Sequence, residues 1–213
     1  MQAAVLRKPK LEKDIAEGAR LAKMYGRDIT PFEVVNVLDN AGVLYVLVGA
    51  HAANGYTGQP RATVDVDVLV RFPKKATAAL VKAFPELTAR DTPVVTRLIR
   101  PDGECAIDVM KSNTSPLWQR LLKLARPVRV AGRPVRIPPV EGILAAKMAA
   151  MVSPLRHIAK KMIDGGDFIQ IVQVTERLNL GLAEELGELV YPGGGKEILK
   201  LIADARAGKR LEF

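Results

Sequence analysis

The segment 44–70 constrains this chain more than any other, because it joins two apolar runs through a polar loop. Aspartate interrupts the second run twice, at Asp65 and Asp67. Side chains of a β-strand alternate between its faces, so both carboxylates are expected on one face, with the valines on the other. Two like charges at this spacing repel each other unless a cation or a basic group lies between them. A solvent-facing aspartate pair and a site for a hard cation such as Mg²⁺ both explain the pattern.

The first apolar run predicts a buried strand over 43–48, since it is short and rich in Val, Leu and Tyr. It ends at Gly49 and Ala50, and a helix can begin at His51. A strand that ends in glycine lets a ligand approach closely, and the free N–H groups at the start of a helix attract an anion. A tight strand-to-helix turn without a ligand explains the same residues.

A third aspartate, Asp108, lies in a predicted strand over 105–110, which forms a hairpin with 94–100. Burial of an unpaired carboxylate is costly, so Asp108 needs a partner, either an arginine or a cation. If this strand lies beside the one with Asp65 and Asp67, three carboxylates converge and can hold two Mg²⁺ ions.

Two such ions are the arrangement that displaces pyrophosphate from a nucleoside triphosphate (NTP). Asp65 and Asp67 are then expected to hold the ions that carry the triphosphate. Asp108 would help hold the ion at the attacking hydroxyl and accept its proton. The turn after Gly49 is expected to cradle the phosphates, with Arg61 and His51 neutralising their charge.

The remaining pattern predicts mixed helices and strands up to Pro138 and only helices after it. Helices are expected over 11–24, 31–40, 73–83, 117–125, 140–152, 157–178, 182–190 and 196–205, and a second hairpin is expected over 128–137. We therefore predict an α/β region over 1–137 and a helical C-terminal region over 138–213.

Two features of the helical region carry charge. Lys147 lies in an alanine- and methionine-rich helix, so its ammonium needs a partner, either a triphosphate or one of the aspartates. Lys160, Asp164 and Asp167 share one helix face, where a solvated row of ion pairs is expected and a catalytic role is the alternative.

Composition narrows the class of partner. The net charge of +9 favours polyanions such as NTPs or RNA, but aromatic residues make up only 5% and do not interleave with basic ones, so no base-stacking platform is indicated. The single cysteine, Cys105, excludes an intrachain disulfide and a cysteine-based zinc site. Neither a membrane helix nor a secretion signal is expected, which favours a cytoplasmic protein.

Together, these motifs resemble the nucleotidyltransferases of the DNA polymerase beta superfamily. The resemblance rests on the strand ending at Gly49, the loop with Arg61 and Thr63, the Asp65-Val66-Asp67 motif and the later Asp108. Within the superfamily, the chain most resembles minimal nucleotidyltransferases and AbiEii-type toxins. The helical part of those proteins carries a lysine and a basic residue before Asp-x-x-Asp. The resemblance covers residues 43–172. The family has Gly-Gly or Gly-Ser where this chain has Gly49-Ala50, so the small side chain and the backbone N–H are kept but the serine hydroxyl is missing.

The resemblance implies an α/β (α+β) fold, with a small mixed sheet flanked by helices and a helical C-terminal region. It implies Mg²⁺-dependent transfer of a nucleoside monophosphate (NMP) from an NTP to a hydroxyl of tRNA, protein or a small molecule such as an aminoglycoside, and a role in a toxin–antitoxin system. The implied catalytic and metal-binding residues are Asp65, Asp67 and Asp108, and the implied nucleotide-binding residues are Gly49, Ala50, His51, Arg61, Thr63 and Lys147. A non-catalytic nucleotide-binding or antitoxin-like protein of the same fold, and a structural sheet with surface aspartates, are the alternatives.

Overall fold

The computed structural model describes residues 9–26 and 28–212. Residues 1–8, on which part of the expectation about a secretion signal rests, lie outside the described residues. The helices are α1 (Pro9–Met24), α2 (Pro31–Asn40), α3 (Gly49–Thr57), α4 (Pro73–Ala83), α5 (Pro116–Leu124), α6 (Val140–Val152), α7 (Ile158–Val174), α8 (Leu180–Glu188) and α9 (Gly194–Arg206), with a 3₁₀ turn η1 (Ser112–Thr114). The strands are β1 (Tyr45–Leu47), β2 (Val66–Val70), β3 (Thr88–Asp91), β4 (Val95–Ile99), β5 (Cys105–Lys111), β6 (Arg126–Val130) and β7 (Arg133–Ile137). Among the described helices, none has the length and apolar character needed to cross a membrane.

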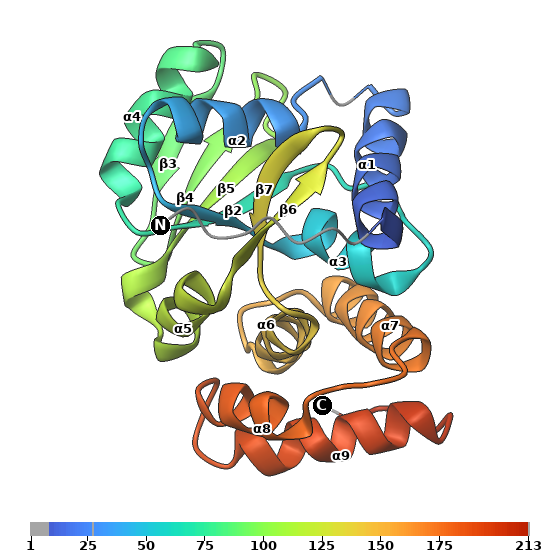
Figure 1. Ribbon diagram of the computed structural model, residues 1–213. Helices are drawn as coiled ribbons and strands as arrows, with labels where there is room; N and C mark the ends of the chain where they lie inside the picture. The colour runs from blue at the N-terminus through green and yellow to red at the C-terminus, as the bar shows by residue number, and fades with distance from the viewer. Residues whose placement is uncertain (1–8, 27, 213) are drawn as a thin grey trace, which may run out of the picture.

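Five strands form a mixed sheet in the order β1-β2-β5-β4-β3 (Figure 1). The central pair, β2 and β5, is parallel, whereas the other neighbours are antiparallel. This pairing places Asp67 directly opposite Asp108. The condition for the three carboxylates to converge, that their strands lie side by side, is therefore met.

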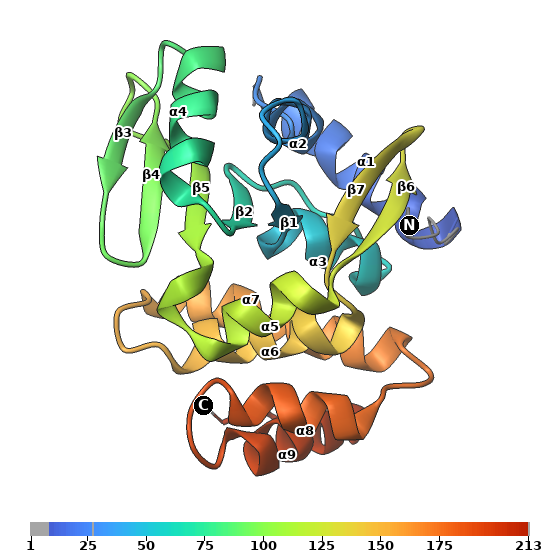
Figure 2. The same cartoon turned by 60° about the vertical axis from the view of Figure 1, so that its left-hand side comes forward.

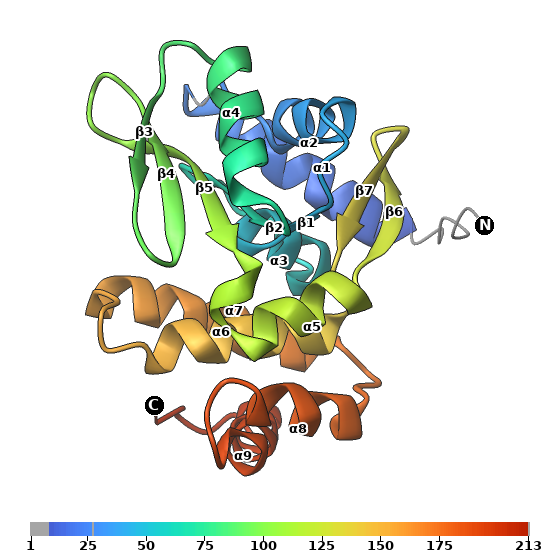
Figure 3. The same ribbon diagram turned by 90° about the vertical axis from the view of Figure 1, so that its left-hand side faces the viewer.

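Helices cover the sheet on both faces and below it. Helix α4 packs against one face of β3, β4 and β5 (Figure 3), and α3 packs against β2 and α1. The hairpin of β6 and β7 contacts β1 and α1. Helices α6 and α7 lie beneath the sheet, and α8 and α9 pack below them (Figure 2). The mixed sheet with flanking helices and a helical C-terminal region agrees with the predicted fold class.

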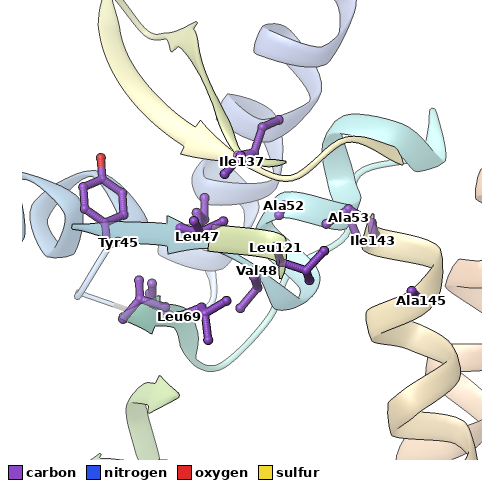
Figure 4. Close-up of a cluster of buried hydrophobic side chains, with 14 of the residues drawn as sticks. Tyr45, Leu47, Val48, Ala52, Ala53, Leu69, Leu121, Ile137, Ile143 and Ala145 are labelled. Carbon is purple, nitrogen blue, oxygen red and sulfur yellow. The ribbon is translucent and has the colours of Figure 1, made fainter. Parts of the chain in front are cut away.

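The apolar core runs through both predicted regions. In Figure 4, Leu47 and Leu69 of the sheet lie near Ala53 of α3, Leu121 of α5 and Ile143 of α6. Burial of these side chains is the main force that holds the helices against the sheet. The predicted division at 137/138 falls between β7 and α6 and stays a prediction.

Local signals explain where most elements begin. At α2, the Thr30 hydroxyl accepts a hydrogen bond from the Glu33 N–H, the Glu33 carboxylate accepts one from the Thr30 N–H, and Pro31 occupies the first turn. One strand was missed, and one helix end was predicted wrongly. Strand β3 was not predicted, because its four residues are all exposed and show no apolar alternation. Helix α7 ends at Val174 rather than near residue 178.

Candidate active site

The three aspartates of the sheet lie together. Asp67 in β2 and Asp108 in β5 are opposite each other, and Asp65 lies immediately before β2. Each of the three residues offers a carboxylate oxygen, and the three oxygens lie within 4.8 Å of one another. All three side chains are partly exposed, so a ligand can reach them from solvent. This carboxylate triad (Asp65, Asp67 and Asp108) has the oxygen ligands that Mg²⁺ prefers.

The charge of the triad is only partly balanced. Burial, and then the nearby charges of Asp65 and Asp108, raise the pKa of Asp67 well above its ordinary value. Burial also raises the pKa of Asp108, although the Cys105 thiol donates a hydrogen bond to its Oδ1 over 3.2 Å. Both upward pKa shifts mean that ionising the triad costs free energy when no cation is present. A divalent ion binds favourably under this condition.

The turn at Gly49 brings the start of α3 against the triad. Gly49 has φ of +62°, and a Cβ atom at this position would lie 1.9 Å from Asp67 Oδ2. The N-cap residue Val48 makes no capping hydrogen bond with its side chain. The backbone N–H groups of Gly49 and Ala50 therefore lie at a helix start without a side-chain cap. Glycine is thus required here for two reasons: the left-handed backbone and the closeness of the carboxylate.

His51 lies in the first turn of α3 and is only 2% exposed. Burial lowers its pKa to about 4, against the opposing effect of the Asp65 charge, so the imidazole is neutral at pH 7. Among the described residues, its Nδ1 has no hydrogen-bond partner. A neutral His51 is a polar group beside the carboxylates, not a fixed positive charge.

The loop between α3 and β2 is held by its own polar groups. The Asn54 amide donates to the Arg61 carbonyl over 2.8 Å and accepts from the Arg61 N–H over 3.1 Å. The Thr63 hydroxyl donates to Asp65 Oδ1 over 2.9 Å. Through these contacts the loop fixes where Asp65 lies relative to Asp67.

A network of charged side chains joins this loop to α6 and α7. Asp167 accepts hydrogen bonds from Arg61 Nε (3.0 Å) and Nη2 (2.9 Å), and from Lys147 Nζ (2.6 Å). Lys147 also donates to Asp164 (2.8 Å), which in turn accepts from Arg156 Nε (2.6 Å). We call these five residues the ion network. Because Asp164 and Asp167 are 3% and 5% exposed, the expected solvated row of ion pairs was wrong.

The ion network keeps Asp167 charged. Burial alone would raise the pKa of Asp167, but hydrogen bonds from Arg61 and the positive charge of Lys147 outweigh it, and the net shift is downward. The Arg61 fork is bidentate, which is the strongest common geometry for an arginine and a carboxylate. Arg61 therefore anchors the loop that carries Thr63 and Asp65.

The structure brings some of the predicted site residues to the triad and places others beside it. Gly49 and Thr63 contact the aspartates directly, and Ala50 and His51 follow in α3. Lys147 is bound to Asp164 and Asp167, one of the two kinds of partner proposed for it. The nucleotide-binding roles of these residues, and of Arg61, stay predictions.

Sequence reasoning missed Asn54, Arg97 and Arg156. Arg97 lies opposite Asp108, and their closest charged atoms, Nε and Oδ1, are 3.6 Å apart. Counting outward from the predicted turn of the 94–110 hairpin would have paired these two residues. No comparable signal marks Asn54 or Arg156, because their partners are fixed by tertiary packing.

Comparisons with known proteins support a known fold. A scan of protein-family models finds no match, and a search of curated proteins finds no relative. Among solved structures, an antigenic nucleotidyltransferase-like protein from Paracoccidioides brasiliensis matches 97% of this chain and 96% of its own, with a TM-score of 0.50 and 20% identity. The antibiotic-resistance factor ANT(2'')-Ia matches 83% of this chain and 95% of its own (TM-score 0.53, 14% identity). JHP933 from Helicobacter pylori matches 90% and 93% (TM-score 0.50, 15% identity).

These matches cover 83–97% of this chain and 93–96% of the matched chains, at 14–20% sequence identity. They show that the chain has a nucleotidyltransferase fold, as the sequence motifs predicted. The narrower resemblance to minimal nucleotidyltransferases and AbiEii-type toxins stays a prediction.

Proposed function

We propose that this protein is a metal-dependent nucleotidyltransferase that moves an NMP from an NTP to a hydroxyl group of an acceptor. The observation that carries the proposal is the carboxylate triad, formed where β2 and β5 run in parallel. A sheet with merely solvent-facing aspartates has no reason to place three carboxylates within 4.8 Å, where burial and repulsion disfavour their ionised forms.

The triad fits a pair of Mg²⁺ ions by the chemistry of its donors and by its unbalanced charge. Asp65 and Asp67 would hold the ions on the triphosphate side, and Asp108 would help hold the ion on the acceptor side. When bound, such ions neutralise phosphate charge and lower the pKa of the attacking hydroxyl.

The residues of the chain supply position and proton transfer. The backbone N–H groups of Gly49 and Ala50, at the uncapped start of α3, would bind the triphosphate, and the lack of a hydroxyl at Ala50 leaves this contact to the backbone. Thr63 orients Asp65 through its hydrogen bond. Asp108, whose pKa is raised mainly by burial, is suited to accept the proton of the acceptor hydroxyl.

Arg61 and Lys147 are proposed to serve the nucleotide from the ion network. The Arg61 side chain is 37% exposed, so a phosphate could reach its guanidinium although Nε and Nη2 bind Asp167 and Nη1 donates to the Ala62 carbonyl over 3.2 Å. Lys147 is 7% exposed and contributes positive potential near the triad from within the protein. Neutralisation by His51 would require its protonation, which burial opposes at pH 7.

The acceptor is proposed to be a hydroxyl of tRNA, protein or a small molecule. A tRNA acceptor would suit a toxin of a toxin–antitoxin system, and the fold match to an antibiotic-resistance factor supports including antibiotics in the test. A second candidate, a non-catalytic nucleotide-binding or antitoxin-like protein, is favoured by one observation: Ala50 lacks the hydroxyl of the Gly-Ser form of the family motif.

The test is incubation with each labelled NTP and MgCl₂, alone and with total tRNA, protein extract or an aminoglycoside. The parent is compared with the variant Asp65→Ala/Asp67→Ala and with Glu86→Ala/Glu212→Ala, which removes two exposed carboxylates outside the triad. We expect transfer of label by the parent and the control but not by the triad variant.

Binding separates the two candidates if no label moves. Magnesium-dependent NTP binding that is lost only in the triad variant would leave the non-catalytic protein as the function. Absence of NTP binding in all three proteins would rule out the triad as a nucleotide site.

A further inference from the structure

A row of charged residues crosses four neighbouring strands of the sheet. Asp67 in β2 pairs with Asp108 in β5, Asp108 pairs with Arg97 in β4, and Arg97 pairs with Arg90 in β3. Residues directly opposite each other in a sheet project from the same face. Two carboxylates are therefore followed by two guanidinium groups along one line, with α4 packed against the other face of the sheet.

A pocket of about 230 Å³ lies over the cationic half of this row. Its lining includes Asp65, Arg90, Arg97, Cys105, Asp108 and Lys160. Lys160 comes from the first turn of α7, so a helix far away in the sequence adds a third positive charge to the two arginines. The pocket thus opens directly beside the carboxylate triad.

The three cations of the pocket are weakly engaged, unlike those of the ion network. Arg97 is 53% exposed and only approaches Asp108, at 3.6 Å. Arg90 and Lys160 are exposed, and no ion pair ties them to a carboxylate within residues 9–26 and 28–212. In contrast, the cations Arg61, Lys147 and Arg156 have carboxylate oxygens within 2.9 Å. Each of those three cations is held by a close carboxylate, whereas the cations of the pocket have no carboxylate contact as short among the described residues and are more available to a ligand.

The order of the strands separates the pocket from the donor side. Gly49 and the start of α3 follow β1, at one edge of the sheet, and β4 and β3 lie on the other side of the triad. With the NTP phosphates at Gly49, the reacting hydroxyl has to arrive from the side of Asp108. Neighbouring strands are about 5 Å apart, so Arg97 lies about 5 Å and Arg90 about 10 Å beyond Asp108.

We infer that Arg90, Arg97 and Lys160 form an acceptor subsite that binds a phosphate group next to the reacting hydroxyl. The inference rests on the proposed function, because that function places the acceptor at Asp108. Arginine binds phosphate oxygens through its planar fork, and lysine adds a point charge. The subsite favours a phosphate-bearing acceptor, such as the 3′ end of an RNA or a sugar phosphate. It repels a polycation such as an aminoglycoside.

The test measures binding without donor or metal, so that it does not depend on catalysis. A short fluorescein-labelled oligoribonucleotide is titrated in EDTA over a range of salt, with ribose 5-phosphate and ribose as competitors. Arg90→Gln/Arg97→Gln and Lys160→Gln are compared with Arg129→Gln/Arg133→Gln, which removes two arginines from the distant β6–β7 hairpin. Thermal melting checks that each variant folds.

We expect the Arg90→Gln/Arg97→Gln variant to bind the oligonucleotide about tenfold more weakly, with a salt slope reduced by about 1.4, and the hairpin control to bind like the parent. Arginine-dependent binding of the oligonucleotide assigns the subsite to RNA. Arginine-dependent binding of ribose 5-phosphate alone assigns it to a small phosphorylated acceptor. Equal binding by parent and variant in both arms would overturn the inference.

Binding of NTP with Mg²⁺ on the same proteins distinguishes this inference from the proposed function. If the parent binds the NTP and transfers its NMP with release of pyrophosphate, but replacing the arginines changes binding of neither phosphate ligand, only the acceptor subsite is wrong. If the arginines bind phosphate but the parent binds no NTP, the phosphate site stands and the proposed function fails.

Discussion

At the scale of single residues, Gly49 is the position where one methyl group has the largest expected effect. A Cβ atom there would overlap Asp67 Oδ2 at 1.9 Å, and the backbone has φ of +62°. A left-handed backbone costs roughly 1–2 kcal/mol for a residue with a Cβ, and the overlap additionally displaces the carboxylate. We therefore predict that Gly49→Ala lowers the melting temperature and abolishes the stabilisation by Mg²⁺, both measured by thermal melting with and without the ion.

Gly132→Ala is the matched control, because Gly132 has φ of +80° but nothing within 4 Å of a built Cβ. It carries the same backbone strain in the β6–β7 turn without touching a carboxylate. Both variants should be destabilised, but only Gly49→Ala should lose the response to Mg²⁺. An equal response in the two variants would show that the contact with Asp67 does not matter.

Asp67 gives a prediction about pH. Burial, and then the charges of Asp65 and Asp108, raise its pKa in the folded protein, whereas the unfolded chain titrates near an ordinary aspartate value of about 3.9. The folded state then holds the proton more tightly than the unfolded state. Protonation of Asp67 therefore contributes fully to the stability of the folded state below pH ~4, and this contribution is lost as the pH rises through the raised pKa.

Asp67→Asn should therefore stabilise the metal-free protein at pH 7, by a few degrees in melting temperature, and have little effect near pH 4. In MgCl₂ the order should reverse, since only the parent retains the full triad. Melting curves in EDTA and in MgCl₂ across this pH range provide the measurement. A variant less stable than the parent at every pH in EDTA would contradict the assigned cost of the Asp67 charge.

The sequence alone was sufficient to predict that the three aspartates lie together, but not to predict all of the residues that surround them. Asp65, Asp67 and Asp108 were predictable because carboxylates in apolar strands are costly and strand alternation fixes their faces. The partners of Lys147 were not, since helix spacing places Asp164 and Asp167 on one face without showing whether that face is buried. Their burial depends on how α7 packs against α3 and α6.

At the scale of elements, Asp167 is the point where α7, α6 and the loop before β2 meet. It is 5% exposed and accepts from both Arg61 and Lys147. Removing one partner of a buried ion pair typically costs about 3–5 kcal/mol, because charges remain without a partner. Asp167→Ala should lower the free energy of unfolding by at least about 3 kcal/mol, measured by urea denaturation.

The same variant should weaken NTP binding, because Arg61 no longer anchors the loop with Thr63 and Asp65. Glu17→Ala is the control: it breaks an exposed pair with Arg20 on α1, where solvent screens the charges and little stability is expected to change. Equal loss of stability in the two variants would show that the ion network does not hold these elements together.

Apolar periodicity and capping signals located the other predicted helices and strands to within about two residues, so the misses are informative. Strand β3 contains Thr88, Ala89, Arg90 and Asp91, all exposed, and it is a strand only because β4 offers its edge. Beyond the end of α7, the Asn179 backbone N–H donates to Glu141 of α6, and the Asn179 side chain caps α8. Tertiary contacts of this kind leave no local pattern.

At the scale of the whole molecule, the architecture changes at 137/138 from mixed strands and helices to helices alone in the described residues 138–212. A single apolar core nevertheless contains residues from both sides of this point. Buried side chains on both sides, such as Leu121 and Ile143, belong to the same apolar cluster. The Tyr56 hydroxyl also donates to the Pro138 carbonyl over 2.8 Å. We propose that the regions 1–137 and 138–213 are distinct in composition but depend on each other for stability.

This dependence predicts that the full chain unfolds in urea in a single transition that coincides for circular dichroism and for fluorescence of its one tryptophan, Trp118. The fragment 1–137 should show no cooperative melting, because it loses the buried face of α6 and the Asp167 partner of Arg61. Mixing it with the fragment 138–213 should restore a transition if the two regions need only each other's surfaces. Cooperative melting of 1–137 alone, near the temperature of the full chain, would instead make 137/138 a boundary between independently stable domains.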